Sequence, residues 1–223
     1  MTSQPLFEKV AVIGLGLIGS SLCHVMKREG LASSIAGVAR SKETLHTALR
    51  IGFIDTEHET ARAAVDGADL IVLATPVGAN SVLAEQIAPS LKQGAIITDV
   101  GSVKVSVIRD VQPHLPDGVH FVPGHPVAGT EYSGPESGFA ELFENRYCIL
   151  TPPDGTDQNA IDKTRKLWRA AGSIVEIMDA DHHDRVLAIT SHLPHLIAYT
   201  IVGTANDLEG QLREKKAGGE IKI

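Results

Sequence analysis

Three glycines near the start of the chain have the spacing of a phosphate-binding turn. Gly14, Gly16 and Gly19 form a G-x-G-x-x-G pattern directly after the apolar residues 10–13. The first glycine permits a tight turn, the second lets a pyrophosphate approach the backbone, and the third lets a helix pack closely on the strand. The pattern predicts a dinucleotide site, and the plainer alternative is a glycine-rich turn in an ordinary α/β protein. The residues expected to bind the cofactor are Gly14, Leu15, Gly16, Leu17, Ile18 and Gly19.

The segment around Arg40 bears on the choice of nicotinamide cofactor. Sites that prefer NAD usually place an acidic residue about 20 positions after the glycines, where it binds the ribose 2′-hydroxyl. No Asp or Glu occurs between Leu31 and Lys42. Arg40 and Ser41 could instead bind a 2′-phosphate through charge-assisted hydrogen bonds, which favours NADP over NAD. The alternative is a solvated arginine beside a site that accepts both cofactors.

Two residues able to handle a proton follow later predicted strands. Ser102 comes after the strand expected at residues 95–99, and His125 lies in a loop after the central strand expected at residues 120–123. Ligands of open α/β sheets bind beyond the carboxyl ends of the strands. We therefore expect His125 to accept a hydroxyl proton while hydride leaves the carbon, with Ser102 hydrogen-bonded to the same hydroxyl or to the histidine. The alternatives are a surface histidine and a helix-capping serine. Two more turns are expected along the cofactor and contain Thr75, Pro76, Val77 and Gly101.

Several histidines follow Asp179. His192 and His195 share one face of a predicted helix, whereas His183 precedes His195 by about three helical turns. Nothing supplies cysteine or carboxylate partners at short spacing, so we expect no metal site. His183 and His195 are expected to be part of the polar lining of a cleft between two domains.

The elements that must position these residues alternate between strand and helix up to residue 178. This alternation predicts a mostly parallel, Rossmann-type α/β sheet with helices on both faces. A long helix over residues 181–206, bent at Pro194, then begins a partial helical domain over residues 179–223. The expected strands span residues 9–13, 34–39, 70–75, 95–99, 120–123, 147–151 and 173–177, and the helices between them residues 41–51, 59–65, 80–91, 103–111 and 160–171.

Composition limits the partners that the chain can have. The 223 residues are 43% hydrophobic and 21% charged, with a net charge of −7 and no basic block, so we expect no nucleic-acid partner. The longest uninterrupted apolar runs, residues 10–19 and 70–79, are too short to span a bilayer, so we expect no membrane partner. Cys23 and Cys148 lie in apolar surroundings and are expected to be free thiols in a reducing cytoplasm.

Four runs of residues resemble the prephenate/arogenate (cyclohexadienyl) dehydrogenases of tyrosine biosynthesis. They span residues 14–20, 99–104, 124–131 and 191–195, and the resemblance extends from Val10 to about Asn206. It implies oxidative decarboxylation of prephenate or arogenate with hydride transfer to NAD(P)+, giving 4-hydroxyphenylpyruvate or tyrosine. It also implies that His125 binds the hydroxyl, that Ser102 orients that hydrogen bond, and that His183 and His195 line the substrate side. Members form homodimers.

The C-terminal part departs from that family pattern. Members continue into further helices and carry a Phe-Arg-Asp-Phe-Thr-Arg-like stretch whose arginine holds the substrate carboxylate. This chain has no phenylalanine after Phe143, and residues 212–223 resemble nothing in the pattern. We therefore expect a C-terminally truncated member with impaired activity. The alternatives are another reductase, such as a hydroxyacid dehydrogenase, and a non-catalytic cofactor-binding remnant or helix-mediated assembly module.

Overall fold

The computed structural model describes the backbone of residues 4–217 and the side chains of residues 4–209. The chain divides into two compact units, Met1–His183 and Asp184–Ile223, and each is described by itself. The domain division expected at residue 178 stays a prediction.

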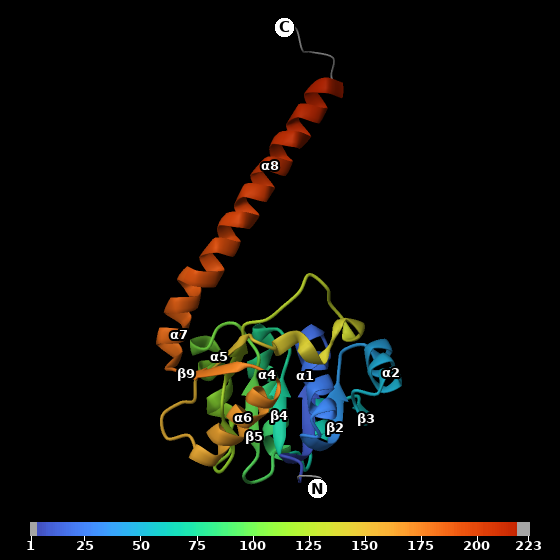
Figure 1. The fold of residues 1–223 in the computed structure, drawn as a ribbon, viewed down its shortest axis with the longest axis vertical. Helices are drawn as coiled ribbons and strands as arrows, with labels where there is room; N and C mark the ends of the chain where they lie inside the picture. The colour runs from blue at the N-terminus through green and yellow to red at the C-terminus, as the bar shows by residue number, and fades with distance from the viewer. Residues whose placement is uncertain (1–3, 218–223) are drawn as a thin grey trace. The chain divides into compact units, whose positions relative to one another are not determined.

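The first unit is built around a six-stranded sheet (Figure 1). Its strands follow the order β3-β2-β1-β4-β5-β6, and every neighbouring pair is parallel. The strands are β1 (Phe7–Ile13), β2 (Ala32–Val38), β3 (Thr56–His58), β4 (Leu70–Leu73), β5 (Ile96–Asp99) and β6 (His120–Phe121). Strand order reverses between β1 and β4, and this is where open α/β sheets bind their ligands. The predicted parallel α/β sheet is confirmed.

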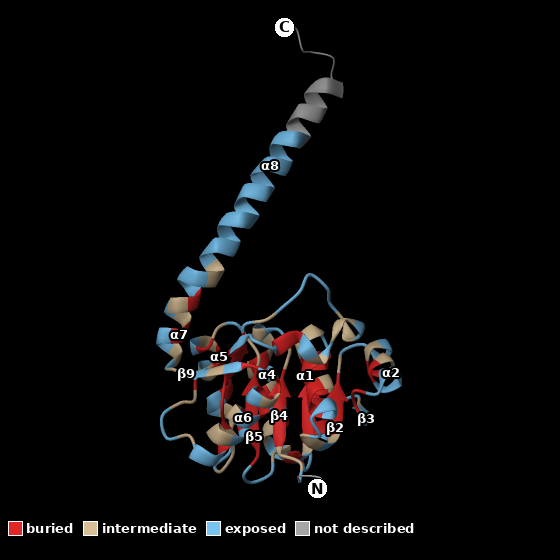
Figure 2. Cartoon of the chain, in the orientation of Figure 1, coloured by how far each residue is buried: buried red, intermediate tan, exposed pale blue. Residues whose placement is uncertain are grey.

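Helices cover both faces of this sheet because alternate strand residues point to opposite sides. Val10 and Val12 belong to one hydrophobic core with residues of α1, α2 and α6. Ala11 and Ile13 belong to a second core with residues of α3, α4 and α5. Figure 2 shows the strands as the buried centre of the unit. The helices are α1 (Leu17–Arg28), α2 (Lys42–Ile51), α3 (Ala61–Val65), α4 (Asn80–Ile87), α5 (Val105–Val111) and α6 (Gln158–Ala170). Short 3₁₀ turns are η1 (Val77–Ala79), η2 (Ala88–Ser90), η3 (Gln112–His114), η4 (Pro135–Ser137) and η5 (Ala140–Phe143).

The last strands form a separate three-stranded sheet, where the sequence suggested a continuation of the first. Its order is β7-β8-β9, with β7 (Gly124–Pro126) antiparallel to β8 (Tyr147–Leu150) and β9 (Ile174–Ile177) parallel to β8. β6 is therefore the edge of the first sheet, and the expectation of a central strand before His125 is wrong. The chain leaves the first sheet after Phe121 and pairs in the second from Gly124 onward.

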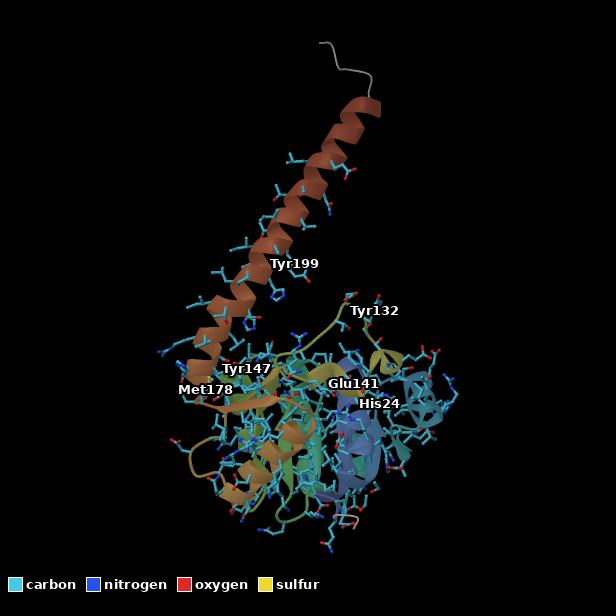
Figure 3. The ribbon with its side chains drawn as sticks, in the orientation of Figure 1. His24, Tyr132, Glu141, Tyr147, Met178 and Tyr199 are labelled. Atoms are coloured by element: carbon cyan, nitrogen blue, oxygen red, sulfur yellow. The ribbon has the colours of Figure 1, made fainter. Side chains whose placement is uncertain are left out.

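The segment between β7 and β8 packs against α1. The backbone N–H of Phe139 donates to the Ser21 hydroxyl at 3.1 Å, and Arg28 forms ion pairs with Glu141 and Glu144 at 3.0 and 3.2 Å. Figure 3 labels Glu141 from η5 and His24 from α1 at this contact. These contacts fix the helix that follows the glycine turn.

The second unit is a helix interrupted once. The helical residues are α7 (Ala180–Leu187), the π-helical turn η6 (Ala188–His192) and α8 (Leu193–Ala217), and α7 begins in the first unit. The irregularity expected at Pro194 takes the form of this π turn, because proline has no N–H to continue the α-helical bonding. One stretch, Ala180–Glu209, is long and apolar enough to cross a membrane, and a core helix of a soluble protein passes the same test. The search of the sequence for uninterrupted apolar runs missed this stretch, because polar residues interrupt it.

Candidate active site

The glycine turn joins β1 to α1 at the point where strand order reverses. Gly14 has a φ of 104°, and a Cβ there would collide with the carbonyl oxygen of Ala74, which follows β4. A Cβ at Gly19 would collide with the carbonyl oxygen of Gly14, so this glycine allows α1 to approach the turn. At Gly16 a Cβ would meet nothing within 4 Å. The open space at Gly16 is what a bound pyrophosphate requires.

The start of α1 suits an anion. Gly16 is the N-cap residue, has no side chain to occupy the first N–H groups, and is followed by a first turn without acidic residues. Those N–H groups and the helix dipole attract a phosphate. Leu15 is buried in the core, so only its backbone can face a cofactor, while Leu17 and Ile18 are half-buried. These residues fit a dinucleotide, and their binding role stays a prediction.

Arg40 and Ser41 lie directly after β2, at the same edge of the sheet. Arg40 is exposed and available to an anion. The Ser41 oxygen caps α2 by accepting from the Thr44 N–H at 3.4 Å, which leaves the hydroxyl hydrogen able to donate. The binding of a 2′-phosphate by these two residues stays a prediction.

The turns after β4 and β5 approach each other. A Cβ at Gly101 would lie 2.8 Å from the side chain of Val77, so these two turns are in contact. Thr75 and Pro76 precede η1 and are half-buried and exposed, respectively. Together with the contact between Gly14 and Ala74, this brings the predicted cofactor residues of β1, β4 and β5 to one edge.

Ser102 lies in the turn between β5 and α5, and its side chain is exposed. The alternative that it caps the next helix is wrong, because α5 begins at Val105 and its N-cap residue is Lys104, without a side-chain cap. Its hydroxyl is therefore not committed to the helix, and its predicted contact with substrate stays a prediction.

His125 lies in strand β7 and is 7% exposed. The expectation of a loop histidine is wrong in this respect, because pairing with Ile149 of β8 extends the backbone there. A strand holds the imidazole more firmly than a loop does. The backbone N–H of His125 donates to the neighbouring Cys148 sulfur, and burial raises the pKa of that thiol well above its usual range.

His183 is completely buried and contacts His125. The Nδ1 of His125 and the Nε2 of His183 lie 2.8 Å apart, with the rings nearly perpendicular at 70°. Asp179 starts the helix that carries His183: its carboxylate accepts from the His182 N–H at 2.7 Å, and its carbonyl from the His183 N–H at 3.0 Å. The structure thus pairs two residues that sequence reasoning placed in the same cleft without linking them.

His195 and His192 belong to the second unit. The Nδ1 of His195 donates to the Ser191 carbonyl at 2.8 Å, which leaves Nε2 as the acceptor in the neutral ring. The predicted role of His195 at the substrate stays a prediction. Within residues 4–209, no group of three His, Cys, Asp or Glu side chains could hold a metal ion.

Sequence reasoning missed Asp99 and Lys104. Both side chains are fully buried and form an ion pair at 2.5 Å, next to the Ser102 turn and the His125 strand. A signal was present, since an aspartate ends a strand that begins with two isoleucines, and a lysine follows five residues later.

Two family models match the chain. Residues 22–177 match the model described as prephenate dehydrogenase, nucleotide-binding domain, and residues 179–221 match prephenate dehydrogenase, dimerization domain. The chain belongs to the prephenate dehydrogenase family. The second match extends to residue 221, so the expectation that residues 212–223 resemble nothing in the family is wrong up to that position.

Relatives and solved structures of the prephenate dehydrogenase family extend the match. The cyclohexadienyl dehydrogenase of Zymomonas mobilis is 42% identical over 93% of this chain and 70% of its own length. The prephenate dehydrogenase of Bacillus subtilis is 35% identical over 87% of this chain, which spans about half, 53%, of that relative. The Aquifex aeolicus prephenate dehydrogenase structure in complex with hydroxyphenyl propionate and NAD+ has a TM-score of 0.82 at 34% identity, covering 88% of this chain and 68% of that one. Synechocystis arogenate dehydrogenase has a TM-score of 0.79 at 30% identity, with 88% and 68% covered.

Proposed function

We propose that the chain catalyses oxidative decarboxylation of prephenate or arogenate, with His125 as the base at the ring hydroxyl and a nicotinamide dinucleotide as hydride acceptor. The observation that carries the proposal is the buried contact between His125 Nδ1 and His183 Nε2 at 2.8 Å, where Gly124 before His125 bonds to Asp99 at the end of β5. Family membership and the NAD+ complex of the Aquifex relative support it.

The pairing of the two histidines determines what His125 can do. Two ring nitrogens 2.8 Å apart need a proton on one of them. When His125 Nδ1 carries that proton and donates to His183, its Nε2 keeps a lone pair and can act as a base. In the opposite tautomer, Nε2 carries hydrogen and can only donate. We assign the first tautomer, in which His183 also stabilises the imidazolium that forms.

The proposed reaction moves one proton to His125 and one hydride to the cofactor. His125 Nε2 accepts the hydroxyl proton while the carbon bearing that hydroxyl loses hydride, and the oxygen becomes a ring ketone. The bond to the ring carboxylate then breaks, carbon dioxide leaves, and the bonding electrons make the ring aromatic. His125 returns its proton to the resulting phenolate oxygen, so the enzyme ends in its starting state. Bound nicotinamide supplies the hydride acceptor, and Ser102 is proposed to donate to the same oxygen.

NADP is the proposed preference between the two nicotinamide cofactors. Arg40 is exposed at the end of β2, and Ser41 beside it can donate a hydrogen bond. A phosphate on the ribose would gain a charge-assisted bond from the guanidinium that a hydroxyl cannot match.

The second unit is proposed to form a homodimer. Its η6 and α8 expose a series of large apolar side chains, and Figure 2 shows α8 as mostly exposed. The matched dimerization domain supports pairing with a second copy. The exposed apolar residues are Ile189, Leu193, Leu196, Ile197, Tyr199, Ile201, Val202 and Leu208, of which Figure 3 labels Tyr199. Light scattering after size exclusion tests this: a dimer is expected, and a monomer at high concentration would contradict it.

The catalytic proposal is tested by following absorbance at the reduced-nicotinamide band. Purified protein is mixed with prephenate or arogenate and with NAD or NADP, and the aromatic product is identified by mass. We expect reduction with at least one combination and release of carbon dioxide. Cofactor binding without reduction in any combination would overturn the proposal and favour a non-catalytic cofactor-binding protein.

A further inference from the structure

Asp99 and Lys104 form an ion pair inside the first unit. Both side chains are 0% exposed, and the Lys104 ammonium lies 2.5 Å from the Asp99 carboxylate. Removing two charges from water is costly, and an apolar pair of similar volume often serves stability as well or better. Burial raises the pKa of the Asp99 carboxyl, while Lys104 and the N–H groups of Gly101 and Gly124 oppose that rise.

The pair is bonded to the backbone next to both candidate catalytic residues. Asp99 accepts from the Gly101 N–H at 2.8 Å and from the Gly124 N–H at 3.3 Å, and Lys104 donates to the Gly124 carbonyl at 2.7 Å. Gly101 directly precedes Ser102, and Gly124 directly precedes His125. One buried ion pair therefore holds the Ser102 turn and the His125 strand at a common point.

The backbone groups of Gly124 that point away from β8 are bonded to the ion pair. Among the described residues β7 is an edge strand, because β8 is the one strand paired with it. Both backbone groups of Gly124 bond to Asp99 and Lys104 instead. The side chains thus stand where a further strand would be, and they join β7 to the end of β5.

The glycines leave the space that this arrangement needs. A Cβ at Gly101 would lie 2.9 Å from the Asp99 carboxylate, and a Cβ at Gly124 would lie 3.1 Å from the Asp99 carbonyl oxygen. Side chains at either position would push the backbone away from the pair.

We propose that Asp99 and Lys104 are a positioning pair that sets the placement of His125 and of the Ser102 turn for the reaction. This inference rests on the proposed function. A displacement of about 1 Å at a reacting group can lower turnover about 100-fold, which is the effect that a positioning role predicts.

The test compares Asp99→Asn with a core variant of the same unit. Asn keeps the size of the side chain, but its NH₂ group cannot accept from the backbone N–H that it faces. We expect kcat to fall about 100-fold, while KM and cofactor Kd stay within about threefold of the wild type. Ile87→Ala is the matched control, because Ile87 is buried in the last turn of α4. That helix runs from the carboxyl end of β4 back toward the amino end of β5, away from the ion pair. This control should lower stability and leave kcat nearly unchanged.

Amide hydrogen exchange supplies a readout that does not depend on turnover. In Asp99→Asn, exchange at the Gly101 and Gly124 N–H groups should accelerate more than exchange in the rest of the protein. In Ile87→Ala, these two groups should show no such additional acceleration. Unchanged exchange and kcat in Asp99→Asn would overturn the positioning role. If the wild type shows no turnover, the proposed function fails. The hydrogen-exchange experiment still tests whether the ion pair holds the Gly101 and Gly124 backbone.

A double variant covers the case in which Asp99→Asn does not fold. Asp99→Leu with Lys104→Met replaces both charges by apolar groups, so neither charge is left buried alone. A folded double variant with a kcat about 100-fold below the control supports the proposal. A double variant with the kcat of the control, or a pair whose replacement never yields a folded chain, overturns it in favour of a purely structural role.

Discussion

The carbonyl oxygen of Ala74 occupies the position where a Cβ of Gly14 would stand, so the turns after β1 and β4 are in direct contact. Gly16, two residues further on, has open space around it. The same substitution should therefore have opposite effects at the two positions.

Gly14→Ala is expected to destabilise the fold, because the φ of 104° is unfavourable for alanine and the Cβ has no room. Gly16→Ala should leave the melting temperature within about 2 °C of the wild type and weaken cofactor binding at least about tenfold, since the methyl group occupies the space of the pyrophosphate. Calorimetry and cofactor fluorescence titration measure the two effects. Equal cofactor affinity in wild type and Gly16→Ala would contradict the assignment.

His125→Asn should lower kcat by about 10²- to 10⁴-fold, because asparagine cannot accept the hydroxyl proton. Cofactor affinity should change by less than about threefold, since the histidine acts on the substrate. The control is His46→Asn on α2, whose imidazole is 68% exposed and far along the chain from β7. A His125→Asn enzyme with normal turnover would exclude the base role.

His183→Phe should lower kcat about 100-fold, because His125 Nδ1 loses its acceptor and the ring can adopt the unreactive tautomer. His183→Gln should retain more activity, since its amide oxygen can accept from the same Nδ1–H. Steady-state kinetics and the pH profile of kcat/KM of both variants provide the measurement. Equal activity of the two variants would show that His183 only fills space.

The central strands of the first sheet were predictable from the sequence, because strands buried on both faces are rich in apolar residues. Leu70–Leu73 and Ile96–Asp99 are buried throughout. The segment between them has apolar residues at helical spacing, which predicted the helix there. The strands β3 and β7 were not predicted, since each has three residues and β7 contains a proline. Such short strands depend on partners that are distant in sequence.

The sequence allowed individual residues of the candidate site to be predicted, but not the contacts between them. Residue types at strand ends indicated His125 and Ser102, because ligands gather at that edge. The contact between His125 and His183 joins residues 58 positions apart and requires the chain to turn into a second sheet. The bonds of the Asp99–Lys104 pair to Gly124 likewise require β7 to lie beside the end of β5, which the sequence alone does not show.

Arg40→Ala should weaken NADP binding about tenfold or more and change NAD binding much less, because only NADP presents a 2′-phosphate to the guanidinium. Lys42→Ala is the control, since Lys42 is two residues away and pairs with Glu59 at 2.7 Å. Isothermal titration with both cofactors measures the difference. Equal losses of NAD and NADP affinity in Arg40→Ala would remove the basis for an NADP preference.

The Asp69 carboxylate links β1 to the start of β4. It accepts from the N–H groups of Glu8 and Lys9 at 2.7 and 3.0 Å and pairs with Lys92 at 2.6 Å. Partial burial alone would raise the pKa of the Asp69 carboxyl, but the hydrogen bonds from Lys92, Lys9 and Glu8 outweigh it and hold that pKa below its usual value.

Asp69→Asn should therefore lower the free energy of unfolding at pH 7, by about 1–3 kcal/mol. A lowered folded-state pKa means that the stabilisation is fully present above the unfolded pKa of about 3.9 and is lost as the pH falls through the folded value. Urea unfolding of wild type and variant should show a constant difference from about pH 7 to pH 5 and a smaller one below about pH 4. Glu59→Gln is the control: the Lys42 ammonium lowers the pKa of Glu59 too, but this pair is 76% and 75% exposed, so no measurable change is expected. A difference for Asp69→Asn that stays constant into acid would show that its carboxylate charge does not stabilise the fold.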